Sequence, residues 1–178
     1  MVFIVEFPVS SFTGKTDFVI TYNKCSVGCD KCNLKLNGKG IKYNNVLGEL
    51  KAVAPFIDNI IITGGEPLEY KNVNKLIKDI NKLINENSNR NVKIHLYTSG
   101  VKTKKFFKLP FDLLDKIYID YKGNSVNEII ENTKLDKVEA TELLSLYHKV
   151  SKFNKVVFRS STIVDDFIKN EIVYYDEV

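Results

Sequence analysis

Short apolar runs alternate with segments of helical periodicity along most of this chain. Runs rich in β-branched residues, which are typical of strands, occur at 18–22, 59–63, 92–98, 116–121 and 155–164. Apolar residues recur at helical spacing over 44–54, 73–84 and 139–153. The alternating pattern around Ile172 and Tyr174 is consistent with a last strand at 171–175. The sequence therefore predicts strands and helices that follow one another in turn.

This alternation predicts an α/β fold. Continuous apolar strands separated by helices indicate parallel strands buried on both faces, and right-handed crossovers place the helices outside. About five to six strands are too few for a closed eightfold barrel, so we expect a partial (β/α) barrel or an open parallel sheet. Because no linker or internal repeat divides the chain, residues 1–178 are predicted to form a single domain.

Composition narrows the class of protein. The 178 residues are 44% apolar and 27% charged, an ordinary globular balance, and the net charge is only +4. This mild charge gives no support to nucleic-acid binding. No apolar run approaches the roughly 18 residues of a membrane span. The first ten residues carry Glu6 and lack a basic leader, so we expect them to be structured and the protein to be cytoplasmic.

The three cysteines lie within eight residues, as Cys25, Cys29 and Cys32, in the spacing C-x3-C-x2-C. An odd and tightly grouped set makes a poor disulfide framework, whereas reduced thiolates are soft ligands for zinc or iron. Three cysteines would hold three irons of a cubane cluster and leave the fourth open. The alternatives are a structural zinc site completed by Asp30 or His95, or three unrelated buried thiols.

A second motif, Gly64-Gly65-Glu66, follows the strand at 59–63. Two glycines at a strand end allow close backbone approach and unusual dihedral angles. Glu66 would then project an acceptor where an ammonium group could sit. Carboxyl ends of parallel strands meet at one edge of a sheet, so this motif and the cysteines are predicted to lie together.

The cysteine triplet followed by Gly-Gly-Glu, each after its own strand, resembles the radical S-adenosylmethionine (SAM) superfamily. The resemblance implies that Cys25, Cys29 and Cys32 bind a [4Fe-4S] cluster. It further implies that the open iron chelates the amino and carboxylate groups of SAM, and that the Gly-Gly-Glu strand end lies along the methionine part of SAM.

Four further residues have weaker likenesses to the superfamily. Thr98 and Ser99 resemble a polar strand end near the ribose, whereas Lys122 and Arg159 resemble side chains near SAM in glycyl-radical activases. For Lys122 and Arg159 the alternative is a solvated or snorkelling side chain. Lys31 stands where many members have an aromatic residue that stacks on adenine, so the adenine contact is left open.

The resemblance implies radical chemistry. An electron from the reduced cluster cleaves SAM to methionine and a 5′-deoxyadenosyl radical, which takes a hydrogen atom from the substrate. No acid–base dyad is required, so His95 is expected to be structural and His148 to lie on the surface.

The first hypothesis for the substrate is a glycine of anaerobic ribonucleotide reductase. In that case the large subunit of the reductase would be the partner, bound near 35–42, and a flavodoxin or ferredoxin the electron donor. The second hypothesis is a small-molecule enzyme resembling 7-carboxy-7-deazaguanine synthase. The third is a non-catalytic zinc-binding α/β module.

Overall fold

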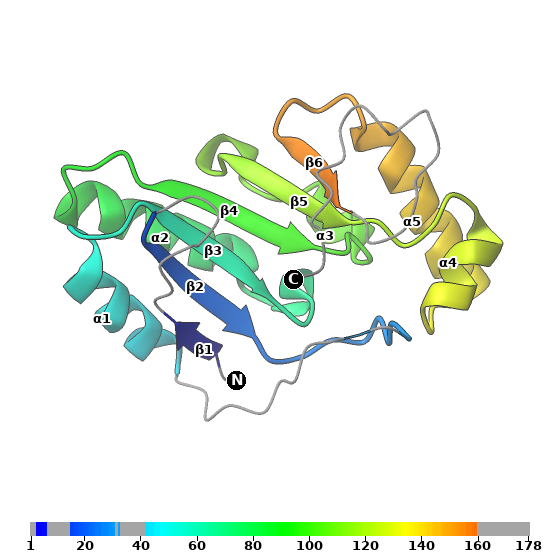
Figure 1. Cartoon of the computed structure of the whole chain (residues 1–178), viewed down its shortest axis with the longest axis horizontal. Helices are drawn as coiled ribbons and strands as arrows, with labels where there is room; N and C mark the ends of the chain where they lie inside the picture. The colour runs from blue at the N-terminus through cyan, green and yellow to red at the C-terminus, as the bar shows by residue number, and fades with distance from the viewer. Residues whose placement is uncertain (1–2, 7–14, 31, 33–41, 160–178) are drawn as a thin grey trace.

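A six-stranded sheet forms the centre of the computed structural model, which describes residues 3–6, 15–30, 32 and 42–159 (Figure 1). The strands are β1 (Phe3–Glu6), β2 (Asp17–Tyr22), β3 (Asn59–Gly64), β4 (Lys93–Thr98), β5 (Lys116–Asp120) and β6 (Val156–Arg159). Strands β2 to β6 pair in parallel in chain order, and β1 pairs antiparallel with β2 at the edge. The predicted α/β fold is therefore confirmed with five parallel strands, and the strand expected at 171–175 lies outside the described residues.

The helices that connect the strands include all three that periodicity predicts. They are α1 (Tyr43–Val53), α2 (Val73–Asn87), α3 (Thr103–Phe106), α4 (Val126–Asn132) and α5 (Lys137–Val150), with 3-10 turns η1 (Pro67–Glu69) and η2 (Phe111–Leu113). The sequence does not reveal α3, α4 and the 3-10 turns because segments of seven residues or fewer are too short to show a period. No helix in the described ranges is long and apolar enough to cross a membrane.

Burial alternates along the parallel strands. Ile60 and Ile62 of β3 are buried, whereas Ile61 between them is only partly buried, and β4 and β5 repeat this alternation. Successive side chains of a strand point to opposite faces, so in the described part of the chain the strand residues are fully buried on one face of the sheet and only partly buried on the other. The expectation that the strands are buried on both faces is therefore wrong. The covered face contains the core, to which α2 contributes the fully buried Ile77 and Ile80.

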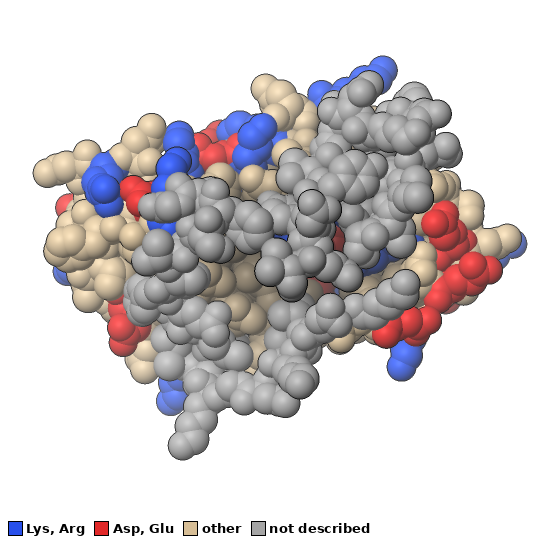
Figure 2. Space-filling model, viewed as in Figure 1, with Lys and Arg blue, Asp and Glu red and all other residues tan. Residues whose placement is uncertain are grey.

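Charged side chains of the described residues are mixed on the face seen in Figure 2. Lys and Arg occur in separate groups with Asp and Glu between them. A continuous basic surface is the electrostatic footprint of a nucleic-acid-binding protein. This visible distribution accordingly lends no support to nucleic-acid binding.

Helix α5 begins with a reciprocal cap. The Asp136 carboxylate accepts a hydrogen bond from the Glu139 amide at 2.8 Å, and the Glu139 carboxylate accepts one from the Asp136 amide at 3.4 Å. This arrangement satisfies two amides that have no partner within the helix.

We expect Asp136→Ala to lower the free energy of unfolding by about 1 kcal/mol, because it leaves the Glu139 amide without its acceptor. Asp136→Asn keeps an acceptor oxygen and should retain most of that stability. Urea unfolding followed by circular dichroism measures both variants. Equal losses in the two would contradict the assigned cap.

Candidate functional site

The segment that carries the cysteines leaves β2 in close contact with the end of β3. The Gly65 amide donates to the Tyr22 carbonyl at 2.7 Å. A Cβ atom on Gly65 would lie 2.2 Å from the Lys24 carbonyl oxygen and 2.8 Å from the Cys25 Cβ. Gly64 has φ +120°, and a Cβ there would lie 2.3 Å from the Tyr22 carbonyl oxygen. Both glycines are therefore required by this backbone-to-backbone contact, as the motif predicts.

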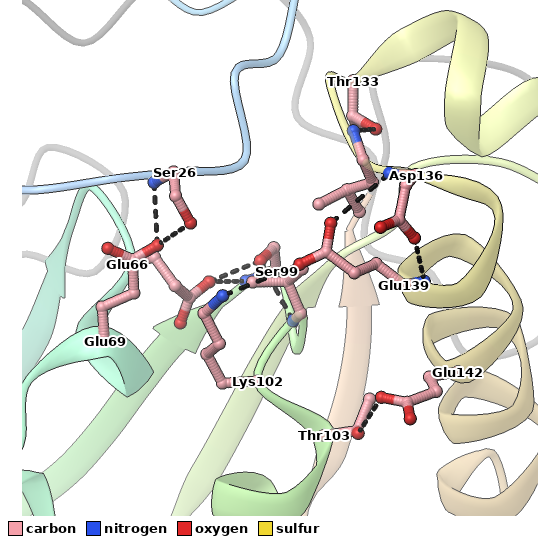
Figure 3. Close-up of polar contacts among 12 residues, drawn as sticks. Ser26, Glu66, Glu69, Ser99, Lys102, Thr103, Thr133, Asp136, Glu139 and Glu142 are labelled. Carbon is pink, nitrogen blue, oxygen red and sulfur yellow. Dashed lines mark hydrogen bonds and ion pairs between the residues drawn. The ribbon is translucent and has the colours of Figure 1, made fainter.

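Glu69 provides a second attachment for the same segment, and sequence reasoning missed it. One of its carboxylate oxygens accepts from the Ser26 amide at 2.8 Å and from the Ser26 hydroxyl at 2.5 Å (Figure 3). Glu69 is the last residue of η1, two positions after Pro67 of the Gly-Gly-Glu-Pro sequence. The turn that follows the motif thus fixes the residue next to Cys25. Nothing in the spacing of Ser26 and Glu69 signals this contact, because 43 positions separate them.

All three cysteines are free thiols. Cys25 and Cys32 are exposed and Cys29 is partly buried. The described His, Cys, Asp and Glu side chains form no group of three that could hold a metal ion. A structural zinc site is a closed set of four ligands, and among the described residues neither Asp30 nor His95 forms such a set with the cysteines; the three thiols are likewise not gathered around one point, so this arrangement by itself favours neither zinc nor a cluster. Three reduced thiols on one accessible loop fit the donor set of an iron–sulfur cluster, and cluster binding would draw the sulfur atoms together.

The Glu66 side chain is fully buried and joins the ends of β3 and β4. One oxygen accepts from the Leu68 amide at 2.9 Å and from the Thr98 hydroxyl at 2.5 Å. The other accepts from the amide of Ser99 at 2.8 Å and from its hydroxyl (Figure 3). Burial raises the pKa of Glu66, and the four hydrogen bonds oppose that shift.

The structure differs here from the expectation of a projecting Glu66 acceptor. The Glu66 carboxylate is occupied by donors of this chain, and the hydroxyls of Thr98 and Ser99 are directed to it. Thr98 and Ser99 are both buried. Sequence reasoning brings these three residues to one edge, but the hydrogen bonds between them depend on how β3 and β4 pair. Contact of SAM with Gly64, Gly65 and this polar group stays a prediction.

Lys122 and Arg159 lie at the same edge of the sheet, after β5 and at the end of β6. The Lys122 carbonyl accepts a hydrogen bond from the Asn132 side chain at 2.9 Å. The Arg159 guanidinium lies 4.8 Å from the centroid of the Tyr97 ring and 4.0 Å from the Asp120 carboxylate. Arg159 is thus held against the sheet, which differs from a freely solvated side chain. Contact of Lys122 or Arg159 with SAM stays a prediction.

An aromatic column on the less covered face of the sheet was not predicted. The Tyr97 and Tyr118 rings stack with centroids 4.5 Å apart, and His95 meets Tyr118 edge-on at 5.9 Å. Burial lowers the pKa of His95, which keeps its ring neutral near pH 7. The alternation of residues in β4 and β5 could have revealed the column, since it places all three rings on one face. As expected, His148 is exposed on α5.

The chain is similar in sequence to part of a curated protein and similar in fold to several solved structures. No family model matches the sequence. A 7-carboxy-7-deazaguanine synthase of Prochlorococcus marinus is 36% identical over 94 residues, which cover 49% of this chain and 41% of the synthase. The aligned part is thus about two fifths of that relative.

Solved structures extend the likeness to nearly the whole chain. TYW1 with a lysine–pyruvate adduct bound has a TM-score of 0.64 at 14% identity, covering 95% of this chain and 69% of TYW1. Streptococcus suis SuiB bound to S-adenosylmethionine has a TM-score of 0.53 at 16% identity, covering 90% of this chain and 40% of SuiB. At these identities the likeness shows a shared fold.

We predict that Gly65→Ala lowers the free energy of unfolding by at least about 2 kcal/mol, because its methyl group would overlap the Lys24 carbonyl and force the backbones apart. Gly48→Ala is the matched control, since a Cβ there meets nothing within 4 Å and lies in α1. This control should raise stability by about 0.5–1 kcal/mol. Urea unfolding measures both, and a neutral Gly65→Ala would refute the close contact.

Proposed function

We propose, from the radical SAM fold and superfamily that the comparisons support, that this chain cleaves S-adenosylmethionine reductively at a [4Fe-4S] cluster. Cys25, Cys29 and Cys32 are the proposed ligands. The observation that carries the proposal is the direct backbone contact between the cysteine segment and the Gly-Gly-Glu strand end. Two neighbours, TYW1 and SuiB, are radical SAM enzymes, and SuiB is known bound to S-adenosylmethionine.

When bound, the cluster supplies one electron that breaks the carbon–sulfur bond of SAM, giving methionine and a 5′-deoxyadenosyl radical that abstracts hydrogen from the substrate. The chain itself contributes by orienting SAM and the substrate and by excluding water from them. Gly65 lets the Cys25 backbone lie on the end of β3, and Glu66 fixes the β3 and β4 ends to each other. The proposed chemistry transfers no proton through a side chain, so it requires no acid–base pair.

For the reaction we favour formation of a small carboxylated nitrogen heterocycle. The support is the 36% identity to a 7-carboxy-7-deazaguanine synthase over about half of this chain. Activation of anaerobic ribonucleotide reductase is the second candidate, supported by the short C-x3-C-x2-C spacing and by Lys31 at the position before the third cysteine. Most of the partner contact proposed for 35–42 lies outside the described residues. A flavodoxin or ferredoxin is the proposed electron donor for either substrate.

Anaerobically reconstituted protein is expected to hold about four iron and four sulfide per chain. With dithionite and SAM it should form 5′-deoxyadenosine, detected by liquid chromatography. Cys29→Ala should reduce that product to background, because it removes one of three thiolate ligands. His148→Ala, a change on the exposed side of α5, is the control and should keep the wild-type rate. One tightly bound zinc in place of iron would overturn the proposal.

The product that forms distinguishes between the two candidate substrates. Reduced protein supplied with SAM and the precursor of 7-carboxy-7-deazaguanine should form that compound, identified by mass spectrometry, at least about tenfold above a Cys29→Ala control. A glycyl-radical signal in electron paramagnetic resonance on added anaerobic ribonucleotide reductase, with no heterocyclic product, would instead establish the activase.

A further inference from the structure

The cysteine loop is attached at a second place, far along the chain from the Gly-Gly-Glu motif. The Lys134 amide donates to the Val27 carbonyl at 2.9 Å, and the Asp30 amide donates to the Asn132 carbonyl at 3.3 Å. Asn132 is the last residue of α4, and Lys134 lies in the turn before α5. In Figure 1 the segment after β2 extends across from the strand tip toward α4. The loop therefore spans the carboxyl edge between two supports.

Side-chain packing reinforces these backbone hydrogen bonds. Val27 is only 1% exposed, although it lies in a loop between the exposed Cys25 and the partly buried Cys29. Gly28 has φ +63°, and a Cβ atom there would lie 2.8 Å from the aliphatic part of Lys134. Glycine permits both this left-handed backbone and the close approach of the lysine chain. The loop therefore packs closely against the turn in addition to sharing backbone hydrogen bonds with it.

The turn itself is held by the rest of the fold. The Asn132 side chain donates to the Lys122 carbonyl beyond β5 at 2.9 Å. The hydroxyl of buried Thr133 donates to the Ile129 carbonyl at 2.7 Å and accepts from the Leu135 amide at 3.2 Å. A support with its own hydrogen bonds can restrain a loop that would otherwise move freely.

We propose that the α4–α5 turn, Asn132–Lys134, positions the cysteine loop for the cluster, with the Lys134 amide as its main donor. This inference rests on the proposed function. Its contacts fall between ligands, since Val27 and Gly28 lie between Cys25 and Cys29, and Asp30 follows Cys29. The turn therefore restrains the backbone that carries the proposed ligands. Loss of the cluster requires this loop to open, so weakening the turn should speed that loss.

Lys134→Pro tests the backbone donor, because proline has no amide hydrogen. The preceding residue, Thr133, is extended at φ −142° and ψ −179°, a conformation that proline tolerates in its neighbour. Lys134→Ala is the matched control, since it removes the side chain and keeps the amide. In anaerobically reconstituted holoprotein, iron released to a chelator is followed by absorbance. Release should be about fivefold faster for the proline variant than for the alanine variant, the loss expected for one hydrogen bond.

Hydrogen–deuterium exchange of residues 25–32 gives a readout that needs no cluster. In the metal-free chain, Lys134→Pro should speed exchange of this loop relative to Lys134→Ala, with the strands unchanged. If Lys134→Pro fails to fold, Val27→Ala decides the matter, because it removes two methyl groups from the buried side chain of the residue that accepts from Lys134 and should also speed iron release. Equal release and exchange in the variants and wild type would overturn this inference alone. A wild-type chain that binds no iron would overturn the proposed function instead.

Discussion

Contact between two pieces of backbone sets the geometry of the whole site. The cysteine segment can lie against the end of β3 only because Gly64 and Gly65 have no side chains, and any Cβ atom there would meet a carbonyl oxygen closer than 2.5 Å. Hydrogen bonds then tie the two segments at consecutive positions. The loop that carries the proposed ligands is thereby attached directly to the sheet.

Glu66 extends this constraint to the next strand. A buried carboxylate is costly unless its oxygens are satisfied, and here four donors from two strand ends converge on it. These hydrogen bonds therefore hold the β3 and β4 ends in a defined relative placement. Glu69, one turn further on, ties the same region to Ser26. Glu66 and Glu69 thus both stabilise this edge of the sheet, independently of any ligand that the adjacent backbone contacts.

Attachment and accessibility are combined in the cysteine loop. Its backbone is fixed to β3 on one side and to the α4–α5 turn on the other, while two of its three thiols stay exposed. A fixed backbone with exposed thiols would suit a loop that receives the proposed cluster after folding and then holds it at a constant position beside a second ligand. The fold shared with TYW1 and SuiB supplies this edge but leaves the substrate to the residues around it, since one fold serves many reactions.

The sequence by itself determined the five parallel strands, the three longer helices and the need for glycine after β3, because periodicity and backbone freedom are local properties. The cysteines as ligands stay a prediction from thiol chemistry. The sequence did not determine which face of the sheet is covered, or that the Glu66 carboxylate accepts hydrogen bonds from Thr98 and Ser99. Nor did it reveal the support of Val27 by Lys134. Those features join residues far apart in the chain, so they exist only once the strands pair and the turns meet.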